Sequence, residues 1–438
     1  MEHSNKNGAD FHAKAVKGRI DLTNEWHARP GLALPTPMRC SHVVSLRSET
    51  TLDQSRANFT EFCRNQSVSL PADGSRQHVV DIGACKLKWE GHTEATSHTV
   101  LVPGNGQPPF SENALDFLET NKRSQLVDDM FIGVHVEVLE ADESDDSRGL
   151  DTAKSLLGSH QVYGGSMSAD GATVWSAFKL DAEGFIRIVV VDKSLSLGGL
   201  SRLLQRILEM ETYRMLAMMA LPRAREAMTA LGSLEPDVLR VMNELESNKS
   251  EQHQEQSLLE ITGLAARVER IASAHAYPFA AARAYASIVE RRAVEVDEQV
   301  FANNQRYTNF LLRSLQPAMR TCDATELRSN ELAQRVARAA NLLDTMVDMV
   351  KKKQNQDLLE TMAERAKTQL RLQQAVEGFS IFAISYYAVG LIDYCLQALS
   401  TQGIALNHTL ITGLAVPIVF ATVWIQVRSV RKRLSKST

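Results

Sequence analysis

The chain has 438 residues, of which 44% are hydrophobic and 23% are charged, and its formal net charge is −4. This composition is typical of globular proteins, and the length predicts about three domains. No strongly basic stretch with interleaved aromatic residues is present, so we expect no nucleic-acid partner. The five cysteines are scattered without metal-binding spacing, which indicates reduced thiols in a reducing compartment.

Residues 1–20 have no apolar core and are predicted to form a flexible N-terminus without a secretory signal. The stretch NEWHARPGLALPTPMRCSH (24–42) that follows combines histidines and arginines with three prolines. Its candidate ligand-binding residues are His27, Arg29, Arg39 and His42. Two arginines can bind a phosphate or carboxylate bidentately. The alternative is a proline-stiffened segment whose arginines pair with carboxylates of the same protein.

Residues 21–195 alternate between strand-like and helix-like patterns, which predicts a mixed α/β cytoplasmic domain. The expected strands are 38–47, 86–92, 97–102, 131–139, 173–180 and 185–191. The expected helices are 51–64, 112–119 and 150–157. The connections are short, and DAEGF (181–185) is typical of a hairpin turn. We therefore expect a largely antiparallel sheet.

A second polar cluster, KWEGHTEATSH (88–98), begins in one of the expected strands. Because alternate residues of a strand share a face, Glu90, His92 and Glu94 are expected to point the same way. A carboxylate–histidine–carboxylate row can bind a divalent cation, which is the one cofactor that the sequence suggests. The alternative is an exposed polar face of an antiparallel hairpin. No catalytic motif accompanies these residues, so the sequence predicts no reaction.

Residues 196–377 are expected to form a helical, coiled-coil-like stalk domain, because glycine is rare and apolar residues recur every three or four positions. One such stripe comprises Leu332, Val336, Ala339, Leu343 and Met346. Stripes of this kind provide a seam for homo-oligomerisation. The polar run 247–257 is expected to join two helices, and Pro278 and Pro317 are expected to kink or end helices.

The carboxyl end contains two apolar runs, 379–399 and 410–427, in a predicted transmembrane hairpin at 378–428. As helices they would be roughly 31 Å and 27 Å long, enough to cross the hydrocarbon core of a bilayer. Lysines and arginines precede the hairpin and follow it in the basic tail 429–438, but the connector has none. The positive-inside rule then places both termini in the cytoplasm. The alternative is a buried hairpin of a soluble core.

Asp393 is the one ionisable side chain of the first apolar run. An intramembrane carboxylate is costly and is usually functional. If the chain formed an oligomeric channel, Ser385, Asp393 and Gln397 would be expected to face its pore. Otherwise the hairpin is an anchor alone, with the lipid bilayer as its partner.

Seven short stretches of the chain carry a resemblance to a known family. They are NEWHARP (24–30), LKWEGHTE (87–94), ETYRMLAMMALP (211–222), PAMRTC (317–322), RVARAANLL (335–343), LRLQQAVEG (370–378) and AISYYAVGLI (383–392). Together they resemble a bacterial family of uncharacterised membrane-anchored proteins, domain of unknown function 3422. The resemblance implies a C-terminal anchor in the bacterial cytoplasmic (inner) membrane. It implies no activity and no site residue.

The order of domain, stalk, two spans and basic tail also resembles the topology of CorA-type magnesium channels. Their Gly-Met-Asn signature is absent, because the end of the first run reads Leu396, Gln397, Ala398, Leu399. We therefore predict an α+β, membrane-anchored structural or interaction protein. The alternatives are an oligomeric ion channel or transporter with CorA-like topology, and an enzyme or ligand sensor that uses the N-terminal histidines and arginines.

Overall fold

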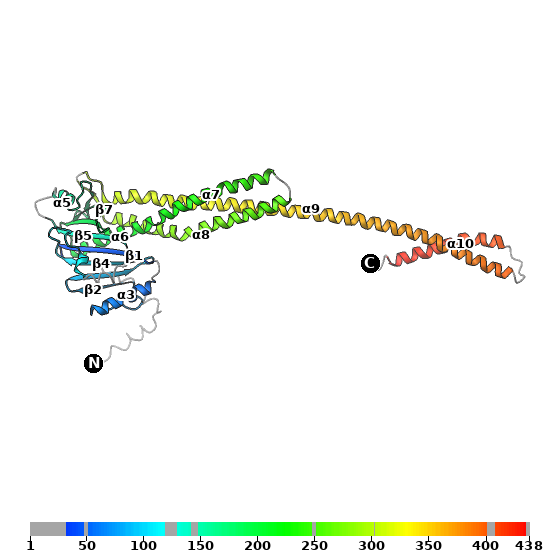
Figure 1. Cartoon of the computed structure of the whole chain (residues 1–438), viewed down its shortest axis with the longest axis horizontal. Coiled ribbons are helices and arrows are strands. Elements are labelled where there is room, and N and C mark those ends of the chain that lie inside the picture. The colour runs from blue at the N-terminus through cyan, green and yellow to red at the C-terminus, as the bar shows by residue number, and fades with distance from the viewer. Residues whose placement is uncertain are drawn as a thin grey trace, which may run out of the picture. The chain divides into compact units, whose positions relative to one another are not determined.

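The computed structural model describes residues 32–47, 51–118, 129–141, 148–247, 251–301, 303–400 and 408–434. It confirms the α+β class, with one nine-stranded sheet followed by long helices (Figure 1). The chain divides into two compact units. The first comprises Met1–Asn243 and Glu260–Ala339, and the second comprises Glu244–Leu259 and Ala340–Thr438. The segment boundaries expected at 195 and 377 follow residue patterns and stay predictions.

The sheet of the first unit has the strand order β2-β3-β4-β1-β5-β8-β7-β6-β9. Its strands are β1 Met38–Leu46, β2 Gln77–Ile82, β3 Cys85–Gly91, β4 Ala95–Pro103, β5 Met130–Glu140, β6 Tyr163–Met167, β7 Ala172–Leu180, β8 Ile186–Asp192 and β9 Gln299–Val300. Neighbouring strands are antiparallel except for the parallel pair β5–β8. The largely antiparallel sheet expected from the short connections is thus confirmed.

The six expected strands are all present within two residues of their expected ends, whereas β2, β6 and β9 were missed. Strand β6 reads YGGSM, and two glycines in five residues weaken a strand pattern. A Cβ on Gly164 would collide with the backbone of Val174 on β7, and one on Gly165 with the backbone of Gln299 on β9. These glycines therefore permit the close approach of the neighbouring strands.

Each face of the sheet is covered by helices, and alternate residues of β1 enter two different cores. Cys40 and Val44 belong to the core beneath α6 (Leu197–Met218), so we call this side the α6 face. Val43 belongs to the core beneath α3 (Leu52–Asn65), on what we call the α3 face. The short helices η1 (Ala114–Phe117) and α5 (Arg148–Leu156) pack on strands of the same sheet.

The long helices expected in the middle of the chain are confirmed. They are α7 Ala220–Ser247, α8 Glu251–Glu295 and α9 Tyr307–Ser400, and α9 also contains the first apolar run. Helix α10, His408–Leu434, contains the second apolar run. The join between two helices expected in the polar run 247–257 is confirmed, since α7 ends at Ser247 and α8 begins at Glu251, but residues 251–257 of that run belong to α8. Pro278 and Pro317 lie inside α8 and α9 rather than at helix ends. Each is followed by a buried residue, Phe279 or Ala318.

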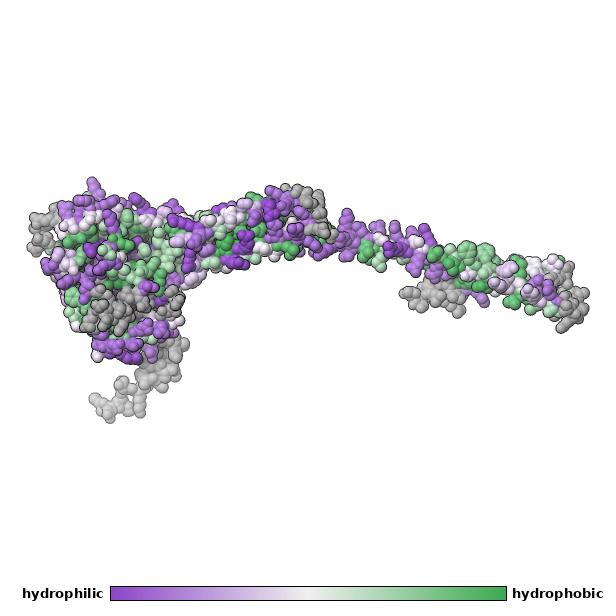
Figure 2. Space-filling view, viewed as in Figure 1, coloured by the Kyte–Doolittle hydropathy of each residue, from purple (hydrophilic) through white to green (hydrophobic). Residues whose placement is uncertain are grey.

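In the second unit, the C-terminal part of α9 and α10 form an antiparallel hairpin. The Oγ1 of Thr412 on α10 donates a hydrogen bond of 3.0 Å to Oδ1 of Asp393 on α9. Eight residues further along α10, the ring of Phe420 meets that of Phe382 of α9, with 5.4 Å between centroids. Both helices are long and apolar enough to cross a membrane by length and composition. Apolar residues gather on the surface of this hairpin in Figure 2.

Candidate functional site

The structure separates two of the residues expected to form one ligand site. His27 and Arg29 lie outside the described residues. Arg39 and His42 both lie on β1, three positions apart, so their side chains point to opposite faces of the sheet. Arg39 contacts the loop on the α3 face, and His42 contacts Thr212 of α6. Arg39 and His42 therefore cannot bind one small ligand together.

Arg39 fastens the loop 104–113 to the sheet. Its Nε donates a 3.0 Å hydrogen bond to the carbonyl of Gly104, and its Nη1 donates 3.1 Å to the carbonyl of Glu112. The same nitrogen lies 3.2 Å from the Glu112 carboxylate, and the guanidinium stacks 4.6 Å above the ring centroid of Phe117. Arg39 is 6% exposed. Arg39 thus contacts groups of its own protein, including the Glu112 carboxylate, as in the alternative considered in the sequence analysis.

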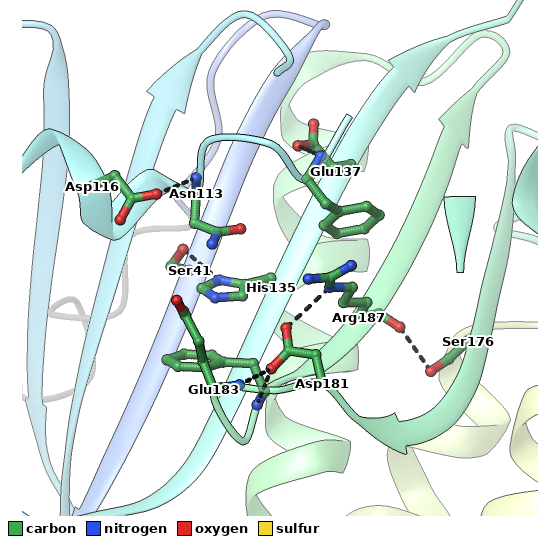
Figure 3. Close-up of polar contacts among 11 residues, drawn as sticks. Ser41, Asn113, Asp116, His135, Glu137, Ser176, Asp181, Glu183 and Arg187 are labelled. Atoms are coloured by element: carbon green, nitrogen blue, oxygen red, sulfur yellow. Dashed lines mark hydrogen bonds and ion pairs between the residues drawn. The ribbon is translucent and has the colours of Figure 1, made fainter. Parts of the chain in front are cut away.

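Glu137 of β5 holds the same loop from a neighbouring position. It lies directly opposite Arg39 in the β1–β5 register and is 2% exposed. Its Oε1 accepts a 2.8 Å hydrogen bond from the backbone N–H of Phe110. Burial raises the pKa of Glu137, and the N–H of Phe110 and the charge of Arg39 oppose that rise. Glu137 thus provides an acceptor for a backbone N–H of the loop (Figure 3). Arg39, opposite it, provides donors for the loop carbonyls.

A second polar row crosses three adjacent strands on the α3 face. Ser41, His135 and Arg187 are register neighbours on β1, β5 and β8. Nδ1 of His135 lies 2.8 Å from Oγ of Ser41 (Figure 3). The imidazole stacks on Phe185 at 3.9 Å between centroids, and Nε of Arg187 donates a 3.0 Å hydrogen bond to Asp181.

The serine–histidine pair in this row has no path to a substrate. A nucleophile and its base must reach the reacting group within hydrogen-bonding distance. Ser41 is fully buried and His135 is 2% exposed, with one face of its ring covered by Phe185. Asp181 meanwhile shapes the predicted hairpin turn, accepting from the N–H groups of Glu183 and Phe185. The row therefore links strands and a turn, and its geometry does not support acyl transfer.

On the α6 face, His42 joins β1 to β4 and α6. Its Nδ1 lies 2.8 Å from Oγ1 of Thr99, and its Nε2 lies 3.0 Å from Oγ1 of Thr212. Burial lowers the pKa of His42 from 6.5 to about 3. A neutral imidazole has one N–H and one lone pair, so one threonine hydroxyl donates to the ring and the other accepts from it.

The structure brings His42 near several residues of the other predicted cluster. Lys88, Glu90 and His92 all act electrostatically on His42. The Lys88 ammonium lies 2.8 Å from Oε1 of Glu90, and the lysine side chain is only 7% exposed. Burial acts to raise the pKa of Glu90, but the charge and hydrogen bond of Lys88 outweigh it, so the net pKa is lowered. The nearly buried ammonium of Lys88 thus has a carboxylate partner on its own strand.

The predicted carboxylate–histidine–carboxylate row is divided among three environments. Strand β3 ends at Gly91, so only Glu90 lies on it. Nε2 of His92 lies 3.2 Å from Oγ of Ser97. Glu94 forms hydrogen bonds with two tyrosines of α8, Tyr277 and Tyr285. Burial is the main cause, and the charge of Glu94 the next, that raises the pKa of Tyr285 to about 12. Within the described ranges, no group of three metal-ligating side chains converges.

The polar residues of the first apolar run differ in their surroundings. Ser385 is 7% exposed, and Asp393 accepts the hydrogen bond from Thr412 of the partner helix. Gln397 is exposed. Within one chain, Ser385 is thus buried in the hairpin, and Asp393 points toward α10. A position facing a pore stays a prediction for Gln397 and the others.

Sequence reasoning missed His135 and Glu137, although a signal for them was present. Both lie in FIGVHVEVLE, an apolar strand pattern with polar residues two positions apart. The period of two predicts that they share a face. The neighbours of His135 (Ser41 and Arg187) and of Glu137 (Arg39) come from strands distant in sequence, so only the strand order of the folded sheet brings them together.

Comparison with known proteins adds the family but no activity. A search of curated proteins finds no match. The family model described as protein of unknown function (DUF3422) matches residues 14–434. This match covers nearly the whole chain and agrees with the resemblance carried by the seven short stretches. The chain therefore belongs to the DUF3422 family of proteins of unknown function.

Proposed function

We propose that the chain is a membrane-anchored structural or interaction protein, held in the bacterial cytoplasmic membrane by the α9–α10 hairpin with both termini in the cytoplasm. The carrying observation is the apolar surface of that hairpin. Phe379 on α9 is 76% exposed and Ile418 on α10 is 63% exposed. Soluble proteins rarely leave large contiguous apolar surfaces in water, so such a surface fits a lipid environment.

The distribution of charge supports the orientation. Arg365, Lys367 and Arg371 precede the spans in α9, and Arg428 begins the basic end of α10. The connector between the spans contains neither lysine nor arginine. Under the positive-inside rule, both basic ends face the cytoplasm.

The contacts within the sheet unit support a role without catalysis. Arg39, His42 and Glu90 are each engaged by groups of the same chain. Each of these contacts ties a strand to a loop, a helix or a neighbouring side chain. The polar residues that drew attention in the sequence thus have structural roles, which favours an interaction module over an enzyme or a sensor. No observation among the described residues or the comparisons supports the CorA-like channel.

The test is membrane retention of the full chain in alkaline carbonate. The wild-type protein is expected to stay in the membrane pellet. Replacing Leu391 and Ile418 together with arginine should release a large share of it, because an arginine at the centre of a span costs about 2.5–3.5 kcal/mol. Leu180→Arg with Val300→Arg is the matched control, because these side chains are equally exposed, at 68% and 63%, on the sheet unit. Equal retention of both double variants would contradict the proposal.

A further inference from the structure

One face of α9 just before the first span is apolar and uncovered by other described residues. The residues that form it, here called the α9 seam, are Leu358, Leu359, Met362, Ala366, Leu370, Leu372 and Val376. Their side chains are exposed, from 54% for Leu370 to 67% for Leu372. At about 100° per residue, all seven fall within an arc of about 160°, which also contains Gln369 and Gln373. Glu360, Glu364, Lys367 and Arg371 occupy the opposite side, so the helix is amphipathic.

The seam is not an extension of the surface that α9 buries against its own chain. The buried stripe of α9 passes through Val336, Leu343 and Val347. Continued at helical spacing, that stripe would reach Gln354, Thr361 and Thr368, which are polar. The apolar face of 358–376 is rotated away from it by roughly a quarter turn. The seam therefore suits a partner other than the helices that cover the earlier part of α9.

We propose that the α9 seam packs against the same seam of a second copy of this chain, in a parallel coiled coil next to the membrane. This proposal rests on the membrane anchor proposed above. Residues 358–376 lead directly into the first span in one helix, so insertion aligns all copies in the same direction and at the same depth. A second copy thus presents the same apolar face at the same level.

The area of the seam fits a partner that shares the membrane. A large aliphatic side chain carries on the order of 100 Å² of apolar surface. Six such side chains, each more than half exposed, leave roughly 350 Å² per copy and roughly 700 Å² for a pair. Stable interfaces in free solution bury about 1,200–2,000 Å². The seam is too small to hold a partner from dilute solution, but confinement to one membrane raises the effective concentration of a second copy.

Charge does not oppose the parallel arrangement. Two charged residues, Arg365 and Glu377, lie within the arc of the seam, each close to one of its opposite edges. In a parallel pair of helices, each edge of the seam on one helix faces the opposite edge of the seam on the other helix. Neither side chain therefore meets its own copy, and the remaining charges of this segment stay on the solvated side.

Cysteine cross-linking in native membranes tests the proposal, because Cys395 is the one exposed cysteine and the other four are buried. In a Cys395→Ser background, Met362→Cys and Ala366→Cys lie in the seam, and Glu364→Cys on the opposite side is the control. Under mild oxidation, the two seam variants should yield a product of twice the 48.5 kDa chain mass, at least tenfold faster than the control. Adding Met362→Glu to Ala366→Cys should abolish it, without affecting the fold, since Met362 is 58% exposed.

Equal cross-linking of Glu364→Cys, or a product whose mass is not twice that of the chain, would overturn the proposal. The same membranes are washed in alkaline carbonate, which reports on the anchor separately. A chain that stays in the pellet but gives no dimer at positions 362 and 366 contradicts the seam alone. A chain that washes off contradicts the anchor, whatever the cross-linking shows.

Discussion

Thr412 and Asp393 are joined by a 3.0 Å hydrogen bond between the two apolar helices, with the threonine hydroxyl as donor. The bond gives the carboxylate a polar partner on the helix that packs beside it. In a membrane this is the arrangement expected for a polar side chain in a span, because few other partners are present there. Asp393 is thereby explained as a contact within the hairpin.

Removing the donor should weaken the hairpin slightly. We expect Thr412→Val to destabilise the detergent-solubilised protein by about 0.6 kcal/mol, the average for interhelical hydrogen bonds in membranes. Asp393→Asn should cost less, because the amide oxygen still accepts from Thr412. Thermal unfolding of the three proteins in one detergent measures the difference. A larger loss for Asp393→Asn than for Thr412→Val would show that the negative charge itself matters.

Acid should destabilise the sheet unit through two buried histidines. Burial lowers the pKa of His42 to about 3 and that of His98 to about 4, from 6.5. Between these values and 6.5 the unfolded chain binds protons that the folded chain does not, so stability is complete above pH 6.5 and falls as pH decreases. Each histidine contributes a slope of about 1.4 kcal/mol per pH unit in that window.

The change that tests this slope is His42→Gln, whose amide keeps a donor and an acceptor for the two threonines. The variant should lose less stability than the wild type between pH 6.5 and 4.5, as measured by chemical unfolding at each pH. His78→Gln is the control, because that histidine hydrogen-bonds at the exposed surface. Parallel pH profiles for the wild type and His42→Gln would refute the assignment.

Glu137 should produce a pH dependence of the opposite sign. Because its folded pKa is raised, the folded state binds a proton more readily than the unfolded state between the ordinary value and the raised value. Stability therefore falls as pH rises through that window. Glu137→Gln keeps an oxygen for the N–H of Phe110 and removes the charge, so its stability relative to the wild type should increase with pH. Unfolding midpoints from pH 4.5 to 8 measure this, and a relative stability that decreases with pH would contradict it.

Arg39 should be needed to hold the loop 104–113. Arg39→Met removes the donors to the carbonyls of Gly104 and Glu112, and we expect a loss of about 1.5–3 kcal/mol, as for hydrogen bonds to charged groups. Amide hydrogen exchange in the loop should accelerate. Glu112→Gln is the control and should cost less than about 1 kcal/mol, because that carboxylate is 66% exposed. Unchanged exchange in Arg39→Met would argue against this role.

The pattern of the sequence predicts most of the fold and little of the site. Strand-like runs of residues located β1, β3, β4, β5, β7 and β8. Strand β6 escaped because Gly164 and Gly165 serve the close approach of its neighbours, which no local pattern reveals. The long helices were evident from the spacing of their apolar residues, although the prolines within them were expected to kink or end them.

The candidate residues could be identified by type but not by partner. Arg39 and His42 are close in sequence, yet the period of a strand sends them to opposite faces. Glu90 and His42 are distant in sequence, yet the pairing of β3, β4 and β1 brings them near one another. Strand order decides such neighbourhoods, and it depends on long-range pairing that a single sequence does not display.

The most direct measurement is the exposure of the connector between α9 and α10. In a Cys395→Ser background, a cysteine at Gly403 should react with a membrane-impermeant maleimide added outside intact spheroplasts. A cysteine at Ser435, in the basic tail, should react only after the membrane is broken. A connector that is protected in intact cells, or a tail that is labelled from outside, would contradict a hairpin that crosses the membrane with both chain ends in the cytoplasm.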